Sequence, residues 1–216
     1  MKAKLTVFAI LLCTMVLACS FASYGAEPSP IQLPSPKMEG GKPLMQALKD
    51  RMTIRTFSEE KLPMQTLSNL LWAAFGINRP DGRRTAPSAR NWQEIDIYVA
   101  TPDGLFLWDP QKNLLNPILT KDIRAMTGTQ PYVKEAAVDF VYVADYSRAT
   151  GEGADKDVWV GADTGFIGEN VYLYCASEGL ATVVRASIDR ETLSKEMKLK
   201  PEQKIMFAQS VGYPKK

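Results

Sequence analysis

The chain has 216 residues, of which 26 are lysine or arginine, 24 are aspartate or glutamate and none is histidine. Without histidine, Ser-His-Asp and Cys-His catalysis are excluded and the commonest zinc ligand is missing, so no metal site is expected. The near balance of charge argues against a nucleic-acid partner, because such proteins need a net basic surface. Any chemistry must then come from a cofactor or a carboxylate.

Residues 1–26 are predicted to be a targeting signal. Lys2 and Lys4 form a basic start, Leu5–Ala18 is an apolar run, and Glu27 is the first acidic residue. The run is short for a bilayer span, so a secretory signal is favoured over a transmembrane anchor. Loss of the two lysines leaves 24 basic against 24 acidic residues, and the mature chain is then close to neutral.

Cys19 ends the sequence Val-Leu-Ala-Cys, which partly resembles the cleavage box of a bacterial lipoprotein. Ordinary cleavage nearby, after Ala22 or Gly25, is the alternative, and both remain open. In either case we expect an exported protein that is periplasmic or tethered to a membrane by lipid. Cys175 would then be the one cysteine inside the mature domain, so no internal disulfide is expected, and its apolar neighbours predict a buried thiol.

Four prolines within residues 27–42 predict an extended, semi-rigid linker, followed by a single domain at residues 43–216. Pro43 is predicted to open a helix that ends near Arg51, since proline is favoured at the first helical position. The apolar stripe of this helix consists of Leu44, Leu48 and Met52.

A second helix is predicted to begin at Pro63, because apolar residues then recur at helical spacing until Gly76. Residues 77–86 combine four turn-forming residues with three arginines, which predicts a loop with solvated charges. Arg84 is the exception that we retain as a candidate for ligand binding.

Runs rich in apolar residues predict the strands of one sheet. The predicted strands are residues 95–99, 105–108, 137–144, 183–184 and 205–211. A turn at residues 102–104 joins the first two strands as a hairpin, and residues 157–178 are predicted to form a long helix. Strands and helices interleave along the chain, so the predicted class is α+β or mixed α/β.

One face of the predicted long helix carries several small residues. Its members are Val158, Gly161, Ala162, Gly165, Gly168, Val171 and Tyr172. Small residues at helical spacing permit the close approach of another helix. Ordinary packing against the sheet of the same chain is the alternative explanation.

Two short motifs carry the chemical information of the chain. Arg51, Thr53 and Arg55 alternate in an Arg-x-Thr-x-Arg-x-Phe run, so an extended chain would project all three to one side. Arginine matches phosphate oxygens in a bidentate way, although a solvated charged turn is the alternative. Some thirty residues later, Pro87–Gln93 reads Pro-Ser-Ala-x-Asn-x-Gln, a polar loop able to offer backbone and side-chain amides to a planar ligand.

Together these motifs resemble the FMN-dependent nitroreductase family, whose members combine Arg-x-Ser-x-Arg-x-Phe with Pro-Ser-x-x-Asn-x-Gln. Asp163–Leu180 is similar to the long central helix of that family, and Val211–Pro214 to its closing strand. The resemblance implies an α+β, three-layer α-β-α fold with a mostly antiparallel central sheet and a long central dimerisation helix. It also implies a homodimer that binds FMN at the subunit interface.

The resemblance assigns roles to ten residues. Those implied to hold the FMN phosphate and ribityl chain are Arg51, Thr53 and Arg55. Those implied to meet the isoalloxazine from the partner subunit are Pro87, Ser88 and Ala89, with Asn91 close by. The segment implied to face flavin N5 through its backbone consists of Val184, Arg185 and Ala186.

This chain departs from the family pattern in two places. Ala186 stands where glycine is usual, and Arg185 is charged where apolar residues are common, which would suit a position near flavin N1 and O2. Many members continue past Gly-Tyr-Pro to a further basic residue that reaches the phosphate, whereas this chain stops at Lys216. Either Lys215 or Lys216 substitutes for that residue, or the contact is missing.

The implied function is two-electron transfer between flavin N5 and a small organic substrate, with the electron donor left open. Asp103–Pro110 is similar to the Asp-Gly-x-Tyr-x-Tyr-Asp-Pro element of the thiazole/oxazole-forming dehydrogenase branch, whose members oxidise their substrates. A reduced quinone, a redox partner protein or the substrate itself could supply electrons outside the cytoplasm. A secreted module that binds flavin or a partner without turnover is the alternative function.

Overall fold

A computed structural model describes residues 29–150 and 155–215 of the protein. Its centre is an antiparallel sheet of seven strands in the order β1-β4-β3-β2-β5-β7-β6. The strands are β1 (Ile31–Gln32), β2 (Ile95–Thr101), β3 (Gly104–Asp109), β4 (Leu114–Leu119), β5 (Val138–Asp145), β6 (Ala181–Arg185) and β7 (Gln203–Gly212). The prediction of an α+β fold with a mostly antiparallel sheet is confirmed.

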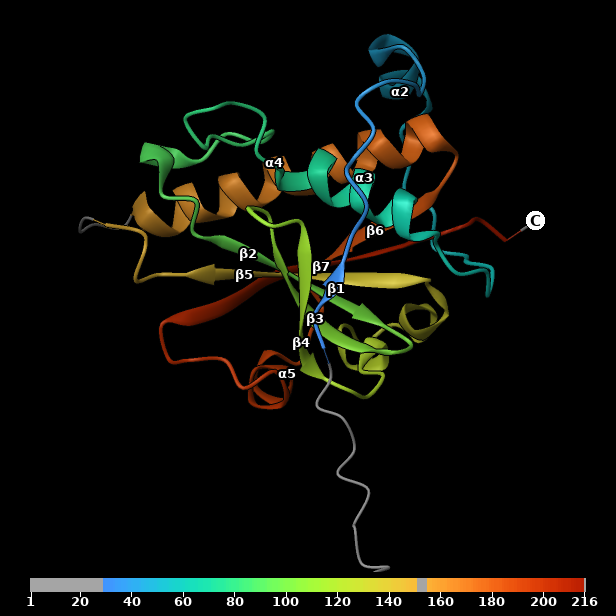
Figure 1. The fold of residues 1–216 in the computed structure, drawn as a ribbon. Coiled ribbons are helices and arrows are strands. Elements are labelled where there is room, and N and C mark those ends of the chain that lie inside the picture. Colours follow the sequence, from blue (N-terminus) through green and yellow to red (C-terminus); the bar gives the residue numbers. More distant parts are fainter. Residues whose placement is uncertain (1–28, 151–154, 216) are drawn as a thin grey trace, which may run out of the picture.

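Helices cover both faces of the sheet (Figure 1). The α-helices are α2 (Leu44–Asp50), α3 (Met64–Phe75), α4 (Asp155–Glu178) and α5 (Arg190–Glu196), and the 3₁₀ helices are η2 (Ala89–Asn91), η3 (Arg124–Met126) and η4 (Pro131–Glu135). Helices α3 and α4 pack on one face, while α5 packs on the other, as Figure 1 shows. The three-layer arrangement expected from the resemblance is therefore present.

The two long helices on the upper face form where the sequence predicted them. Helix α3 follows Pro63 and ends at Gly76, whose N–H donates to the carbonyl of Trp72 at 2.8 Å. Helix α4 begins two residues before the predicted start at position 157 and ends at Glu178 as predicted. Apolar side chains of both helices are fully buried against the sheet, which fixes α4 in place.

Strands β1 and β4 and helix α5 were not predicted. Strand β4 contains Pro117, a residue that sequence rules confine to edges and bulges, and its register with β3 shifts next to Leu105. Helix α5 has only seven residues, and its strongest local signal is the capping residue Asp189, whose Oδ1 accepts from the N–H of Thr192 at 3.1 Å.

The extended segment ahead of α2 packs partly on the domain. Ile31–Gln32 pairs with β4 as the edge strand β1, and the following Leu33 is only 2 % exposed. The hydroxyl of Ser68 on α3 donates to the carbonyl of Pro34 at 2.5 Å. Residues 31–34 thus belong to the folded body, ahead of the domain start predicted at Pro43.

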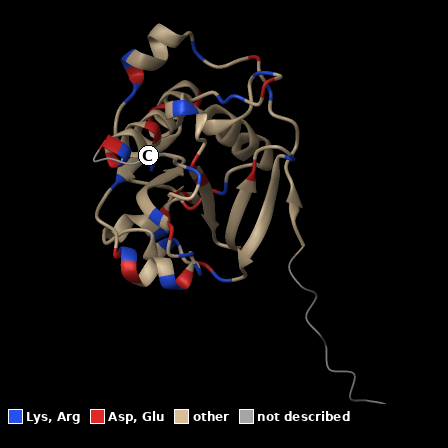
Figure 2. Ribbon diagram, turned by 90° about the vertical axis from the view of Figure 1, so that its left-hand side faces the viewer, with Lys and Arg blue, Asp and Glu red and all other residues tan. Residues whose placement is uncertain are grey.

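Charged residues are more frequent in the helices and loops than in the strands (Figure 2). Cys175 on α4 is fully buried, as predicted, and its thiol is free. In the part of the chain that the structure describes, no helix has both the length and the apolar character needed to cross a bilayer. The predicted signal of residues 1–26 lies outside the described residues.

Candidate functional site

Tyr172 on α4 is the centre of the first cluster of predicted site residues. The hydroxyl of Thr53 lies 3.1 Å from the Tyr172 hydroxyl, and the N–H of Val184 donates to the same oxygen at 3.0 Å. The guanidinium carbon of Arg51 lies 5.5 Å from the centre of the Tyr172 ring, within the range of a cation–π contact. One buried tyrosine therefore connects the Arg-x-Thr-x-Arg motif to β6.

The motif itself is extended, as the alternation of its side chains requires. The N–H of Ile54 donates to the carbonyl of Thr182 on β6 at 3.0 Å, and the N–H of Ser58 donates to Tyr213 at 2.9 Å. The N–H of Lys215 donates to Thr56 at 3.3 Å, so the C-terminal segment runs beside the exposed Arg55. Lys216 lies outside the described residues.

A hollow of about 340 Å³ lies between α4 and the end of β6, next to this cluster. It is lined by Thr164, Gly165, Gly168, Glu169, Tyr172, Val184, Arg185, Ala186 and Phe207. Its volume falls at the lower end of the range for small-molecule sites. A Cβ at Gly168 would lie 4.0 Å from the Val184 side chain and 3.5 Å from Gln209, so glycine keeps this wall of the hollow open.

Arg185 lines the hollow without directing its charge into it. Its guanidinium passes to the opposite face of the sheet, where it donates to Asp139 at 2.7 Å and to the carbonyl of Thr127 at 2.7 Å. The residue is only 4 % exposed. The suggestion that this charge lies near flavin N1 and O2 is therefore not met, because the guanidinium is committed to a buried ion pair.

The second cluster is the loop of Pro87–Gln93. The N–H of Ala89 donates to the Asp163 carboxylate on α4 at 2.7 Å. The Ser88 hydroxyl donates to Glu94 at 3.2 Å and accepts from the N–H of Gln93 at 2.8 Å. These bonds attach the loop to the N-terminal half of α4.

The same loop holds three residues with a left-handed backbone. Arg90, Asn91 and Gln93 have φ values of 51°, 58° and 49°. Non-glycine residues in this region cost conformational energy and concentrate at functional sites. The amide of Gln93 accepts from Arg84 at 2.7 Å and donates to Asn91 at 3.0 Å, which helps to maintain the strained shape.

The predicted site residues thus form two clusters on one chain instead of one site. The first adjoins Tyr172 and the second adjoins Asp163, nine residues earlier on α4. At 1.5 Å per residue, the two anchor points lie roughly 13 Å apart along the helix. A single chain therefore presents the two halves of the predicted site at different ends of α4.

Helix α4 also exposes large apolar side chains. Val158, Trp159 and Phe166 are 69 %, 52 % and 46 % exposed. A Cβ at Gly165 would meet nothing within 4 Å, whereas Gly168 faces the sheet of its own chain and its carbonyl accepts from Gln209. Of the apolar stripe predicted from the sequence, α2 exposes Leu44 and Leu48, and Met52 is exposed just beyond the end of the helix.

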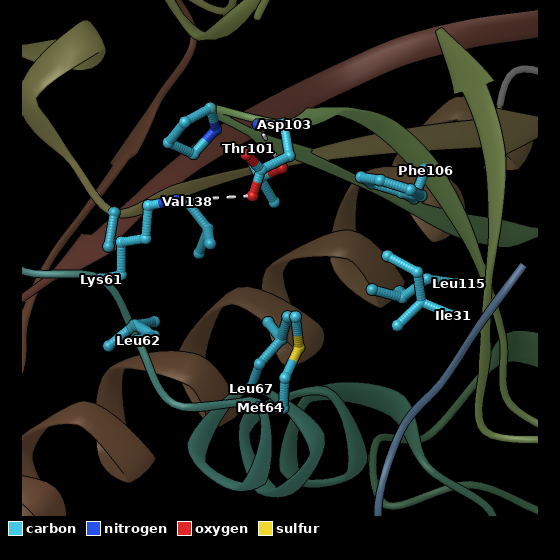
Figure 3. Close-up of a pocket in the computed structure, with 12 residues that line it drawn as sticks. Ile31, Lys61, Leu62, Met64, Leu67, Thr101, Asp103, Phe106, Leu115 and Val138 are labelled. Atoms are coloured by element: carbon cyan, nitrogen blue, oxygen red, sulfur yellow. Dashed lines mark hydrogen bonds and ion pairs between the residues drawn. The ribbon is translucent and has the colours of Figure 1, made fainter. Parts of the chain in front are cut away.

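Another pocket lies between α3 and the sheet (Figure 3). It measures about 70 Å³ and is walled by apolar side chains such as Leu67, Phe106 and Val138. Lys61 and Asp103 form an exposed ion pair of 3.6 Å at its rim. Because none of the ten predicted residues lines it, this pocket is not part of the candidate site.

The carboxyls of Glu94 and Asp163 are a feature that the sequence motifs did not reveal. Glu94 is fully buried, and its Oε1 has no hydrogen-bond partner among the described residues. Burial, together with the neighbouring Asp163, raises the pKa of Glu94 to about 7. Burial raises the pKa of Asp163 as well, so the two carboxyls resist simultaneous ionisation.

The comparisons with known proteins agree with this geometry. The sequence model of the Nitroreductase family matches residues 48–213. "Putative nitroreductase MJ1384" of Methanocaldococcus jannaschii is 29 % identical over 153 residues, which are 65 % of this chain and 77 % of that protein.

Solved structures with the same fold include two nitroreductases assigned by similarity. That of Ralstonia eutropha JMP134 superimposes with a TM-score of 0.84 at 39 % identity, over 89 % of this chain and 92 % of the other. One from Desulfovibrio desulfuricans, in complex with FMN, has a TM-score of 0.61 at 21 % identity, over 81 % and 88 % of the two chains. The present chain belongs to the nitroreductase family, and it is an enzyme of the oxidoreductase class.

The carboxyl pair makes stability depend on pH. The pKa of Glu94 rises from 4.5 to about 7 on folding, so the folded state binds more protons than the unfolded state between these values. Stability should therefore fall as pH rises from about 5 to about 7 and level off above that. We expect the thermal midpoint to drop by several degrees from pH 5 to pH 8, and by clearly less in Glu94→Gln.

The exposed Glu59→Gln provides the matched control and should keep the wild-type pH dependence. Differential scanning fluorimetry across this range measures all three proteins. An unchanged slope in Glu94→Gln would show that Glu94 does not carry the linkage.

Proposed function

We propose that the protein is an FMN-dependent oxidoreductase that exchanges two electrons with a small organic molecule in two successive half-reactions. The observation that carries the proposal is the Tyr172 cluster, where Arg51, the Thr53 hydroxyl and the backbone of β6 contact a tyrosine that lines the 340 Å³ hollow. These are the groups that a phosphate with an attached planar ring would require.

The phosphate end of the cofactor would be held by Arg51 and Arg55. Among residues 29–150 and 155–215, no carboxylate lies within ion-pair distance of either guanidinium. The N–H of Lys215 donates to the carbonyl of Thr56, and the side chain of Lys215 would add a further positive charge near the phosphate. Unpaired arginines next to a hydroxyl and a lysine suit a phosphate, because its oxygens accept charge-assisted bonds.

The ring end would lie along the backbone of Val184–Ala186. When bound, FMN supplies the electron-transfer chemistry, and the protein positions and tunes it. Tyr172 accepts the N–H of Val184 and so fixes the end of β6, while Gly168 leaves space at the opposite wall. The substitution of alanine at position 186 adds one methyl group to this segment relative to the usual glycine.

A homodimer would complete the site. If two copies of α4 pack antiparallel about a two-fold axis, the Asp163 end of one meets the Tyr172 end of the other, because an isologous contact is reciprocal. The loop at Pro87–Asn91 of one subunit would then cover the hollow of its partner. Exposed Trp159 and Phe166 supply the apolar contact between the helices.

In this proposal, the cellular compartment of the protein determines which substrates and electron donors are available to it. The predicted signal at residues 1–26, with Cys19 as a possible lipid anchor, would place the enzyme in the periplasm or on a membrane. Nicotinamide cofactors are not expected there. A reduced quinone, a redox protein or a substrate that is itself oxidised would supply electrons, and Asp103–Pro110 would put the chain in the branch of oxidising members.

The first prediction tests the phosphate contact. Arg55→Ala should weaken FMN binding roughly tenfold to a hundredfold, since a bond to a charged group contributes about 1.5–3 kcal/mol. Riboflavin, which lacks the phosphate, should bind with nearly unchanged affinity. Flavin fluorescence titration measures both ligands, with the exposed Lys61→Ala as a charge-matched control. Equal losses for the two ligands would mean that Arg55 is structural.

The second prediction tests the shared site. Gly165→Leu meets open space in its own chain and raises helix propensity, so the subunit should remain folded. We expect the dimer to dissociate and FMN affinity to fall with it. Glu191→Leu on α5 adds the same side chain to the opposite face and should leave the dimer intact. Light scattering on flavin-loaded protein decides, and a wild-type monomer with full flavin occupancy would end the shared-site proposal.

The third prediction tests turnover and the donor together. The purified protein should be yellow, bleach under a reductant, and reoxidise with a nitroaromatic or a quinone. In anaerobic stopped-flow, NADH and NADPH should reduce the flavin far more slowly than a reduced quinone or a low-potential dye. Rapid, saturable bleaching by micromolar NADPH would contradict the compartment argument. A colourless protein that takes up no FMN would favour the non-catalytic module.

A further inference from the structure

A second hollow, of about 400 Å³, is lined largely by arginine side chains. We call it the arginine hollow, and the residues that matter to it are Arg79, Arg83, Arg84, Pro87, Ser88 and Arg90. From the sequence, most of this charge was predicted to be solvated. The arrangement of the side chains argues against that explanation.

Positive charge in the arginine hollow is poorly compensated. Asp81, at 3.5 Å from Arg83, is the one carboxylate within ion-pair distance of these four arginines in the part of the chain that the structure describes. A chain with nearly equal numbers of acidic and basic residues thus gathers four cations against one anion at this place. Such a local excess attracts anions even though the molecule as a whole is close to neutral.

Arg84 forms the half-buried floor of the hollow. Its guanidinium donates to Gln93 at 2.7 Å and to the carbonyl of Phe75 at 3.2 Å, so both acceptors are neutral. Burial and the nearby Arg148 lower the pKa of Arg84. A partly desolvated cation without an anionic partner gains more from a bound anion than a solvated one does.

The rim of the hollow is held in a fixed shape. The side chain of Gln93 forms hydrogen bonds with the Arg84 side chain, the carbonyl of Gly82 and the Asn91 side chain. These bonds connect the loop segments on the two sides of the hollow. Arg90 has a left-handed backbone and lies 5.7 Å from the ring of Trp92. A strained arginine placed over an aromatic ring is more ordered than a free surface side chain.

The hollow also adjoins the proposed cofactor site. Pro87 and Ser88 line it, and these residues belong to the loop that would cover the partner subunit's hollow in the dimer. A molecule that reacts there would lie within reach of the arginines. This step rests on the proposed function.

We propose that the arginine hollow binds the oxyanion group, a carboxylate or a phosphate, of the small molecule that exchanges electrons at this site. Arg83 and Arg90 at the rim capture the group, and Arg84 supports it from the floor. The enzyme would accordingly prefer anionic substrates over neutral molecules of the same shape.

Equilibrium binding to the flavin-loaded protein tests the proposal without requiring turnover. The probes are benzoate and phenyl phosphate as anions and benzamide as the neutral counterpart of benzoate, measured by isothermal titration calorimetry. We expect one or both anions to bind at least tenfold more tightly than benzamide, with an affinity that falls as salt is raised. Which anion binds more tightly identifies the oxyanion group.

The double variant Arg83→Gln/Arg90→Gln removes both rim charges. It should reduce the ratio of anion affinity to benzamide affinity roughly tenfold or more. Lys195→Gln removes one positive charge from α5 on the opposite face and should keep the wild-type preference. Equal affinities for benzoate, phenyl phosphate and benzamide, or the same preference in the double variant, would overturn the proposal. The absorption spectrum measures flavin content independently of the calorimetry. A protein without bound flavin would count against the proposed function instead.

Discussion

The packing of α4 on the sheet is the constraint on which the rest of the structure depends. One side of this helix is buried against the sheet, and the other side exposes apolar side chains. Val160, Ile167 and Val171 are fully buried and fix the helix to the sheet. Two polar residues on the same helix then organise the site, because Asp163 binds the loop at Ala89 and Tyr172 binds Thr53 and Val184. Neither motif of the site carries its own scaffold. Each motif is attached to α4 by a hydrogen bond, so a displacement of this helix would disturb both together.

On the other face of the sheet, a buried ion pair performs a comparable role. Arg185 donates to Asp139 and to the carbonyl of Thr127, which attaches the segment around η3 to β5 and β6. The tight approach leaves room for glycine alone at position 128, because a Cβ there would collide with the Arg185 guanidinium. Burial raises the pKa of Asp139 and the neighbouring arginine opposes that rise, so removal of either partner would leave an uncompensated buried charge. Because the Arg185 guanidinium is bound to Asp139 and Thr127, a charged residue can occupy β6 beside the proposed flavin without directing its charge toward it.

Much of the fold could be predicted from the sequence, because local signals agree with the tertiary structure where side chains are buried on one face. Pro63 and Gly76 delimit α3, and the apolar runs at β2, β5 and β7 have the residue types of buried strands. The elements that were missed lie at the periphery, where β4 tolerates Pro117 and β1 has only two residues among prolines. Both motifs predicted for the site are hydrogen-bonded to α4 in the structure. The hydrogen bonds that attach the two motifs to α4, and the coupling of Glu94 to Asp163, depend on long-range contacts for which a single sequence carries no periodic signal.

The strained loop at Arg90–Gln93 shows how this scaffold stabilises an unfavourable local conformation. Three left-handed residues cost on the order of 1–3 kcal/mol each. The hydrogen bonds of Ala89 to Asp163 and of Ser88 to Glu94 act against that cost, and the Gln93 amide adds three more contacts. Because Glu94 has a pKa of about 7, the strength of this support varies with its protonation. The loop that would cover the partner's cofactor and shape the arginine hollow is therefore held by the same carboxyl pair that makes stability depend on pH.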